Sequence, residues 1–455
     1  MSVQAPARLG LAWSPGSHKS VVRGGFGIYF EHPTLYQWQS LIGEMVPVNV
    51  AGSYLDNAQI GFAANPLVGV RFPDGPTTQV DKLAATPNQR TVEYNMQPVY
   101  VYRWSLNLER EMGSWFFSAG YSGARGLHNW VAGDGNVYRW VGWPNNVPSD
   151  QKHWTDAATP GYTPVSINPS FANIWVQSSN NNNYYHGLVV NAVRRLKAGL
   201  QLQAAYTFGK SIDYGSAAQN SEGGLPQNER TTYYWDEAMR RGLSSFDIRQ
   251  NFVSNITYQV PETGMKGIGG MAVNGWQVNG VLTWSAGHAF TVTDSTRAQT
   301  TAMRITTGLR PNLITNGKNH PILGRTDAWY DVNQFIPSVC RAGVMCIEQD
   351  PATGRVTNRA DQGYQAGYFG NAGRNTLTGP GLATFDFSLN KNFPVTETTR
   401  VQFRAEFFNL FNRANFRIPI TTPFNTNGTR NPLAGQITDT RTAPREIQFG
   451  LKYIF

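Results

Sequence analysis

The 455-residue chain contains no long apolar run. No stretch approaches the roughly 18–20 consecutive apolar residues of a membrane-spanning helix, so the sequence argues against a helical membrane protein. Residues 1–20, MSVQAPARLGLAWSPGSHKS, also lack the apolar centre of a secretory signal peptide. By this criterion alone, the sequence carries no export signal.

Charged residues are scarce, at 15% of the chain, and low complexity is confined to the short NNNN at 180–183. The formal net charge of +9 reflects a modest excess of basic residues spread along the chain. No clustered basic run of the kind found on nucleic-acid surfaces is present. Aromatic residues, in contrast, make up 13%, which argues against disorder. The composition favours a folded protein with no nucleic-acid partner.

Residues arranged for catalysis or metal binding are also lacking. The seven histidines are scattered, and neither an H-E-x-x-H pair nor zinc-ligand spacing occurs. The Gly-rich segment GNAGRNTLTGPG at 370–381 lacks the ending of a phosphate-binding loop, so we interpret it as leading into a strand. Acidic residues of the long connections, Asp213 among them, do not match an EF-hand and are interpreted as solvated loop residues. We therefore predict no enzyme activity, no metal site and no cofactor.

Only two cysteines occur, Cys340 and Cys346, within VCRAGVMC in a long connection. Thiols oxidise outside the cell, so we expect these two to form a small disulfide loop rather than a metal or redox site. Closing such a short loop would stabilise mainly local structure.

The dominant positive signal is alternation of apolar and polar residues. In FDFSLNKNF at 385–393, one face of a strand carries Phe385, Phe387, Leu389 and Phe393, and the other carries Asp386, Ser388, Asn390 and Asn392. The same period of two occurs in other segments, which gives about eleven strands in all. With that first example, the segments are 8–13, 21–30, 100–109, 115–121, 184–196, 200–208, 246–260, 276–284, 385–393, 401–407 and 445–455. The sequence predicts an all-β, antiparallel sheet with one apolar and one polar face.

The connections between these segments alternate in length. Short links are SPGSHK, EMGS, KAG and PVTETT, with the somewhat longer PETGMKGIGGMA, and the long connections lie near 31–98, 123–182, 212–245, 287–382 and 413–444. Loops beyond roughly 15 residues are uncommon in compact domains, yet here they occupy every second connection. Short periplasmic turns and long extracellular loops are typical of outer-membrane barrels. The pattern predicts an up-and-down transmembrane β-barrel.

Three details favour lipid as the environment of the apolar face. The strands are about nine to eleven residues long, as a tilted strand crossing a bilayer requires. Trp and Tyr lie near strand ends, as in an aromatic girdle, and charged residues occur on the polar faces in mid-strand. The former are Tyr100, Trp115, Tyr121, Tyr258, Trp276 and Trp284, and the latter Arg103, Arg249, Arg404 and Glu406. A soluble all-β binding protein is the alternative, and it predicts Phe387, Phe403 and Trp284 inside a dry core.

Several stretches also resemble a known family. They are ARLGLAWSPGSHKSVVRGGFGIYFE, SWFFSAGYSGARGLH, LQAAYTFGKSID, GYFGNAGRNTLTGPGLATFDFSLNKNFPV, RVQFRAEFFNLFNRANF and TRTAPREIQFGLKYIF. In this order, along nearly the whole chain, they resemble the C-terminal half of the barrel of an Oar-like TonB-dependent outer-membrane receptor. The resemblance implies that residues 1–455 are the C-terminal portion of the barrel, about half of a 22-stranded one. It places the chain in the outer membrane of a Gram-negative-type bacterium.

The resemblance also gives a meaning to the last segment, REIQFGLKYIF. Barrels of this family end in an aromatic residue that the barrel-assembly machinery reads. The corresponding residues here are Phe449, Leu451, Tyr453 and Phe455. The resemblance further implies contacts with outer-membrane lipid, with an unidentified solute, and with TonB through an N-terminal part. A signal peptide, a plug and a regulatory-like domain are not visible in the sequence.

Two functions follow from this reading of the sequence. The first is uptake of a solute, for which loops rich in Asn, Tyr and Trp favour a saccharide or a peptide. The second is a structural or adhesive outer-membrane barrel that transports nothing.

Overall fold

A computed structural model describes the chain in several ranges: 7–16, 19–31, 89–136, 168, 174–216, 237–294, 310–313, 321–337, 347–349, 356–358, 372–396, 398–425 and 428–455. These ranges form one 13-stranded sheet and three small two-stranded ladders. No helix within them has both the length and the apolar character to cross a membrane.

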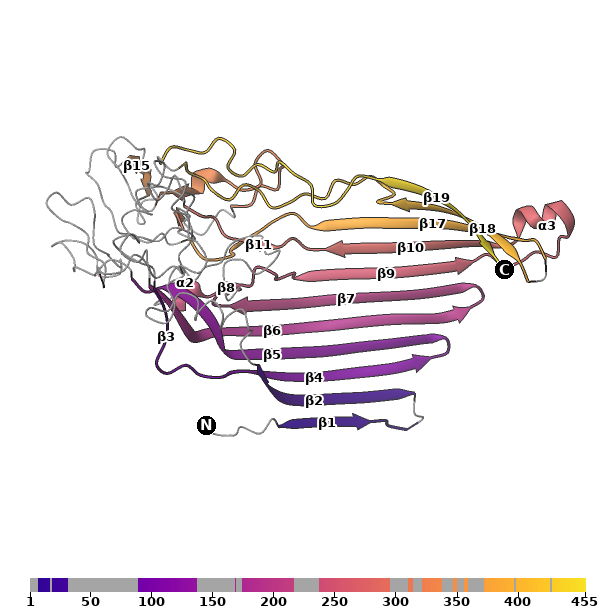
Figure 1. Cartoon of the computed structure of the whole chain (residues 1–455), viewed down its shortest axis with the longest axis horizontal. Helices are drawn as coiled ribbons and strands as arrows, with labels where there is room; N and C mark the ends of the chain where they lie inside the picture. The colour runs from indigo at the N-terminus through magenta and orange to yellow at the C-terminus, as the bar shows by residue number, and fades with distance from the viewer. Residues whose placement is uncertain are drawn as a thin grey trace, which may run out of the picture.

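Eleven strands of the large sheet follow one another in sequence order, each antiparallel to the next (Figure 1). They are β1 (Arg8–Trp13), β2 (Ser20–Glu31), β4 (Val99–Met112), β5 (Trp115–Asp134), β6 (Ile174–Lys197), β7 (Leu200–Asp213), β9 (Gln250–Gln259), β10 (Trp276–Ser285), β17 (Leu382–Pro394), β18 (Arg400–Phe408) and β19 (Glu446–Ile454). Each predicted alternating segment corresponds to one of them. The predicted up-and-down arrangement of eleven strands is confirmed.

Tight turns connect the strands at one end of the sheet. The β6–β7 hairpin turns through Ala198 and Gly199, whose φ angles are 50° and 77°. Two consecutive positive φ angles are the geometry of a type I′ turn, which matches the twist of antiparallel strands. The β4–β5 hairpin turns through Gly113, at φ 63°, and Ser114. We call this end of the sheet the turn-side rim and the opposite end the loop-side rim.

Two strands are much longer than predicted. β5 has 20 residues and β6 has 24, so the pair continues well beyond the segments 115–121 and 184–196. The extension of β6 includes the Asn-rich residues 180–183, and the register shifts between Gly126 and Val131 of β5. The asparagines at 180–183 do not alternate with apolar residues, so the alternation predicts a β6 that is shorter than the observed strand. In the opposite direction, β9 begins at Gln250 and not at residue 246.

Shorter elements lie at the loop-side rim. β3 (Gln89–Val92) pairs with β6 in parallel, and β8 (Gly242–Leu243) pairs with β7 after the short helix α2 (Glu237–Arg240). The small ladders are β11 (Ala289–Phe290) with β16 (Leu377–Thr378), β12 (Asn312–Leu313) with β13 (Phe335–Ile336), and β14 (Ile347–Gln349) with β15 (Val356–Asn358). A 3-10 turn, η2 (Val332–Gln334), precedes β13. The helix α3 (Gly267–Val273) lies at the turn-side rim with the C-terminus (Figure 1).

The apolar face of the sheet is exposed. Leu9 of β1 is 73% exposed, Leu106 of β4 52% and Leu451 of β19 75%. Phe387 and Phe403 are half-buried and Trp284 is 39% exposed, so none lies inside a dry core. The soluble alternative predicted these three residues inside a dry core, so this result contradicts it.

The sheet has two edges. In the described residues, β1 pairs only with β2, and β19 only with β18. The sheet is therefore open between its first and last strands, as expected for part of a larger barrel.

Candidate functional site: the polar face and the loop-side rim

The polar face carries a series of hydrogen-bonded side chains from neighbouring strands. Arg23 on β2 pairs with Glu109 on β4 at 3.2 Å, and Glu109 also accepts from Asn107 at 3.3 Å. Similar contacts recur along the sheet, between Asn191 and Ser118, Asn279 and Ser388, Gln402 and Asn392, and Arg404 and Gln402. Charged and amide side chains in such number, most of them only partly buried, suit a wet surface rather than a packed core.

One aromatic ring on the polar face is flanked by two cations. Tyr29 of β2 lies beneath the guanidinium groups of Arg8 and Arg103, which are 4.9 and 5.4 Å from its ring centroid. Arg103 therefore lies within a strand on the polar face, as predicted, and so does Arg404 on β18. Arg249 differs, because it precedes β9 and its guanidinium stands 5.9 Å from the ring of Phe208. The prediction of a mid-strand position for Arg249 is wrong, because β9 begins later than the alternation suggests.

The predicted girdle residues fall mostly at strand ends. Trp115 and Trp276 begin β5 and β10 at the turn-side rim. Tyr100 and Trp284 lie near the loop-side ends of β4 and β10. Tyr121 is the exception: β5 continues to residue 134, so Tyr121 lies inside the strand, where its hydroxyl contacts Nδ1 of His186 at 2.6 Å.

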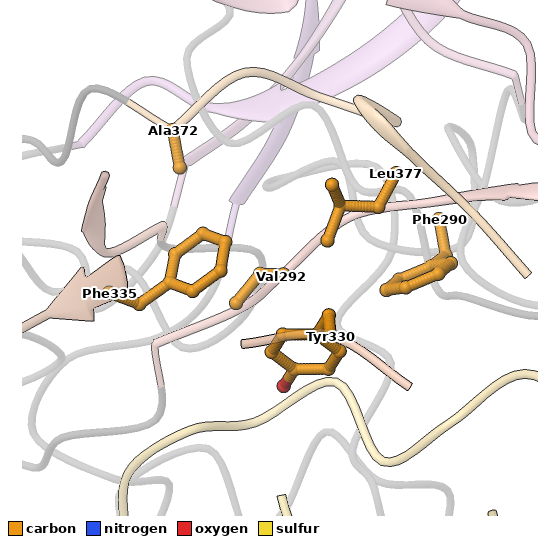
Figure 2. Close-up of a cluster of buried hydrophobic side chains, with 6 residues drawn as sticks. All are labelled: Phe290, Val292, Tyr330, Phe335, Ala372 and Leu377. Atoms are coloured by element: carbon orange, nitrogen blue, oxygen red, sulfur yellow. The ribbon is translucent and has the colours of Figure 1, made fainter. Parts of the chain in front are cut away.

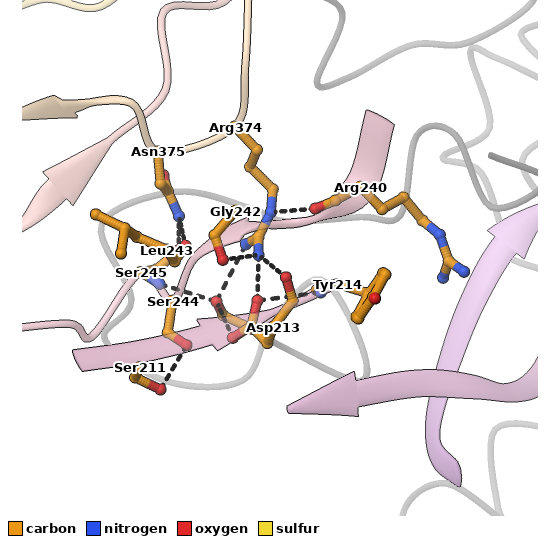
Figure 3. Close-up of polar contacts among 12 residues, drawn as sticks. Ser211, Asp213, Tyr214, Arg240, Gly242, Leu243, Ser244, Ser245, Arg374 and Asn375 are labelled. Carbon is orange, nitrogen blue, oxygen red and sulfur yellow. Dashed lines mark hydrogen bonds and ion pairs between the residues drawn. The ribbon is translucent and has the colours of Figure 1, made fainter. Parts of the chain in front are cut away.

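A buried ion pair lies at the loop-side rim, between Asp213 at the end of β7 and Arg374 (Figure 3). Their side chains are only 3% and 11% exposed. Nη2 of Arg374 also donates to the carbonyl oxygens of Asp213 at 2.7 Å and Gly242 at 3.3 Å. Its Nε donates to the carbonyl of Arg240 at 2.8 Å, and its Nη1 to Ser216 Oγ at 3.3 Å. The interpretation of Asp213 as a solvated loop acid is therefore wrong.

The neighbouring residue, Asn375, extends this network. Its Nδ2 donates to the carbonyl of Leu243 at 2.7 Å and to Ser245 Oγ at 3.2 Å. Its backbone N–H donates to Thr291 Oγ1 at 2.9 Å, and that hydroxyl donates back to Asn375 Oδ1. Asn375 has a φ of 52°, a left-handed conformation that asparagine tolerates well. Residues 374 and 375 thus join the β10–β17 connection to the β7–β9 connection through hydrogen-bonded polar groups.

The base of the network contains a second buried acid, Asp247. Its carboxylate accepts a hydrogen bond of 2.6 Å from the backbone N–H of Ser211, whose hydroxyl lies 2.7 Å from that of Ser244. Burial raises the pKa of Asp247, although the hydrogen bond from Ser211 and the nearby Arg249 and Lys210 partly oppose that effect. Burial of a charge is costly, and each of these contacts offsets part of the cost.

The same region contains an apolar cluster, which Figure 2 shows. Its members are Phe290, Val292, Tyr330, Phe335, Ala372 and Leu377. The ring of Phe335 meets that of Tyr330 edge to face at 5.7 Å, and the Tyr330 hydroxyl donates to the carbonyl of Ile420 at 3.0 Å. Ala372 and Leu377 flank the two residues of the polar network, so residues 372–377 belong to both. The described parts of the β7–β9 and β10–β17 connections therefore form one small folded platform.

A histidine links this platform to the last long connection. Nη2 of Arg441 donates to Nε2 of His288 at 2.9 Å, so His288 accepts in its neutral form. Burial, followed by the charge of Arg441, lowers the pKa of His288, and the smaller effects of Ser245 and Asp247 oppose this. The contact is consistent only with an uncharged imidazole.

The residues of the last strand lie as the alternation predicted. Phe449, Leu451 and Tyr453 share the apolar face with Ala405, Phe403 and Val401 of β18, and their exposed fractions are 67%, 75% and 56%. Phe455 follows directly after β19 and is 92% exposed. Whether assembly machinery reads this segment stays a prediction. Cys340 and Cys346 lie outside the described residues.

Sequence reasoning did not identify the ion pair, because its partners are 161 residues apart. The available signal was weak. Arg374 and Asn375 interrupt the Gly-rich segment at 370–381. The composition of that segment predicts only that it leads into a strand. That interpretation is correct for the backbone, since β17 begins at Leu382.

Comparison with known proteins defines the family. Residues 4–448 match the model of the outer membrane beta barrel domain, so the chain belongs to that family. Its apolar face accordingly meets lipid, its polar face lines the lumen, and the protein resides in the outer membrane. The sequence prediction of an all-β outer-membrane barrel is confirmed. A comparison with curated proteins finds no match.

Similar solved structures are outer-membrane transporters and receptors. They include the transporter YddB of Escherichia coli, with 10% identity, a TM-score of 0.40, and coverage of 96% of this chain and 39% of that one. The FrpB iron transporter of Neisseria meningitidis (F5-1 variant) has 8% identity, a TM-score of 0.42, and coverage of 99% and 39%. The ferripyoverdine receptor of Pseudomonas aeruginosa has 10% identity, a TM-score of 0.38, and coverage of 98% and 32%. The chain spans less than two fifths of the length of these proteins.

Proposed function

We propose that the chain forms part of a TonB-dependent outer-membrane receptor that takes up a solute. The observation that carries this proposal is the platform at the loop-side rim. A buried Arg374–Asp213 ion pair and an apolar cluster hold parts of separate long connections in fixed positions. A preformed surface at the mouth of a polar lumen suits capture of a solute, since a binding surface that is already ordered loses less entropy on binding.

In this proposal the eleven strands are the C-terminal half of a 22-stranded barrel. The two sheet edges support this, because unpaired backbone groups in lipid cost several kcal/mol each. A plug and a TonB-contact segment would then be encoded upstream of residue 1. The terminal residues Phe449, Leu451, Tyr453 and Phe455 would serve as the signal for barrel assembly. Removal of Phe455 would lower the amount of receptor in purified outer membranes.

For the solute we propose only a chemical class. Asn-, Tyr- and Trp-rich connections favour a saccharide or a peptide, whereas two of the similar structures are named for iron or ferripyoverdine. The test is growth of the bacterium that carries the gene, with and without the gene, on single sources of each class. Uptake that is lost with the gene and also lost without TonB would support the proposal.

A structural or adhesive barrel is the competing function. It predicts unchanged uptake in the deletion strain and reduced attachment of cells. Reading the DNA upstream in the same frame separates the two further. A plug and a TonB-contact segment favour transport, and their absence contradicts it.

A further inference from the structure

The connection between β9 and β10 contains a helix with exposed apolar side chains. Met265, Ile268 and Met271 recur at three-residue spacing around α3 and are 56%, 88% and 48% exposed. Ile268 and Met271, three residues apart, lie on the same side of α3, and Met265 precedes the helix by two residues. Lys266, between the first two, is exposed as well. A short connection with three exposed large apolar residues needs an explanation, because the described residues of the other links at this rim form no helix.

The sequence of α3, GIGGMAV, is a poor helix former. Three of its seven residues are glycine, each of which costs about 1 kcal/mol relative to alanine in a helix interior. Contacts from outside the helix therefore hold it. Asn274 closes the connection by accepting from both the backbone N–H and the hydroxyl of Thr263, at 2.7 and 2.9 Å.

Two residues of the apolar face fix the end of α3. Trp276 Nε1 donates to the carbonyl of Ala272 at 2.9 Å. Nζ of Lys391 donates to the same carbonyl at 3.3 Å and also to that of Asn274. A cation is favourable at the C-terminal end of a helix, where carbonyl groups lack partners.

The location of these two residues places the helix. Trp276 of β10 pairs directly with Lys391 of β17. The pair Val278–Leu389 lies two residues further along and on the same face of the sheet. Both pairs belong to the apolar face. The last turn of α3 therefore lies at the turn-side rim, on the face of the sheet that meets lipid. The Lys391 ammonium stands 4.9 Å from the Trp276 ring centroid, which shields it there. The end of α3 therefore adjoins the lipid-facing surface of the sheet.

We propose that α3 is an interfacial anchor that binds phospholipid of the inner leaflet of the outer membrane. Met265, Ile268 and Met271 would enter the boundary between headgroups and acyl chains, as the apolar side of an interfacial helix does. Lys266 would extend its ammonium to the lipid phosphate. The anchor fixes the height of the β9–β10 connection relative to the bilayer. The inference rests on the outer-membrane location and not on the identity of the solute.

The test places a fluorescent label at residue 268 in the protein made from its own gene in its own bacterium. The variant Ile268→Cys, in a Cys340→Ser, Cys346→Ser background, carries an environment-sensitive dye. The purified protein is reconstituted in phosphatidylethanolamine and phosphatidylglycerol vesicles. Lipids with a spin label near the headgroup should quench the dye strongly, and iodide from the water should quench it weakly. A dye at Thr398→Cys, exposed in the β17–β18 turn, should show the reverse.

A second label, at Leu188→Cys on the apolar face of β6, reports insertion itself. Lipids with a spin label near the chain end should quench it. Failure of that quenching overturns the membrane orientation and the anchor together. Strong iodide quenching at residue 268, with Leu188 inserted, overturns the anchor alone. Shielding from both quenchers also overturns it, because the occupant is then a protein, such as a second copy of this chain.

The variant Lys391→Met adds a test of the mechanism. It removes the ammonium that holds the carbonyls of Ala272 and Asn274, while the chain of methylene groups stays. The dye at residue 268 should lose its quenching by headgroup-labelled lipid while the dye at Leu188 keeps its own. Unchanged quenching at residue 268 would contradict the holding role of Lys391.

Discussion

At the scale of single residues, Arg374 connects the β10–β17 connection to the β7–β9 connection. Its guanidinium contacts Asp213 and donates to the backbone carbonyls of Arg240, which precedes β8, and of Gly242, which begins it. A buried pair contributes little when it is compared with a well-packed apolar pair, but loss of one partner is expensive. The remaining charge is then buried without compensation.

Replacement of Arg374 by methionine should therefore loosen the platform. The buried carboxylate of Asp213 loses its partner, and such changes cost about 3–5 kcal/mol. The measurement is limited proteolysis of intact cells, in which cleavage within the long connections should become much faster. The matched control is Arg325→Met, which breaks an exposed pair with Asp327 and should leave proteolysis unchanged. Equal protection in both variants would contradict the role of the buried pair.

His288 gives the platform a dependence on pH. Its folded-state pKa is lowered, so the unfolded form takes up a proton at a higher pH than the folded form. The stability of the platform is therefore full above the ordinary histidine pKa of about 6.5 and falls as the pH drops below it. Proteolysis of intact cells should accelerate between neutral and mildly acidic pH.

The variant His288→Gln keeps an acceptor for Arg441 but does not titrate in this range. Its proteolysis should lose most of that pH dependence. A pH dependence as steep as that of the wild type would assign the effect to another group.

The residue scale is also where sequence reasoning reached least far. The sequence indicates a loop acid at Asp213 and places Arg374 within a Gly-rich segment. Neither has a local pattern that reveals its partner, because the contact joins chain segments 161 residues apart. Whether a charge is buried depends on tertiary packing. A loop segment has no repeating pattern of apolar residues from which that packing could be predicted.

At the scale of elements, prediction was far more successful. Strands such as β17 and β18 were found because one face meets lipid and the other water, which imposes a period of two on the sequence. The same reason explains the misses. The extensions of β5 and β6 beyond the apolar region carry Asn and Gly instead, so no alternation marks them. The two-residue strand β8 is too short to show a period.

The assignment of faces can be tested with two adjacent residues of β6. Leu188 pairs with Tyr121 and Phe208 on the apolar face, whereas Val189 points to the polar face with Gly120 and Thr207. Lysine at position 188 should cost about 2–4 kcal/mol if the residue lies near the bilayer midplane. Lysine at 189 should cost much less, because its ammonium reaches water in the lumen.

The comparison uses the protein made from its own gene in its own bacterium and then reconstituted in lipid. Its unfolding in urea is followed by the mobility shift between heated and unheated samples. The midpoint for Leu188→Lys should fall well below that of Val189→Lys. The reverse order would mean that the apolar face does not meet lipid.

At the scale of the whole molecule, the two edges of the sheet matter most. β1 and β19 each have one neighbour in the described residues, and both belong to a membrane-spanning sheet. In lipid, water cannot satisfy their free N–H and C=O groups, and each such group costs several kcal/mol. The alternation of turns and long connections was readable from the sequence. How the sheet is completed could not be predicted, because the partner strands of β1 and β19 are not among the alternating segments of this sequence.

We therefore predict that residues 1–455 do not form a closed barrel on their own. Expressed with a secretion signal, the chain should show no mobility difference between unheated and heated samples, because the edges cannot be satisfied in lipid. Joined to a further set of strands that pair with β1 and β19, it should show the difference. Closure of β1 directly on β19 would contradict this, and cysteine cross-links between Leu9→Cys and Leu451→Cys in the outer membrane would detect it. Such a link would define a smaller barrel of eleven strands, and the polar face would then enclose a narrower lumen, since barrel diameter grows with the number of strands.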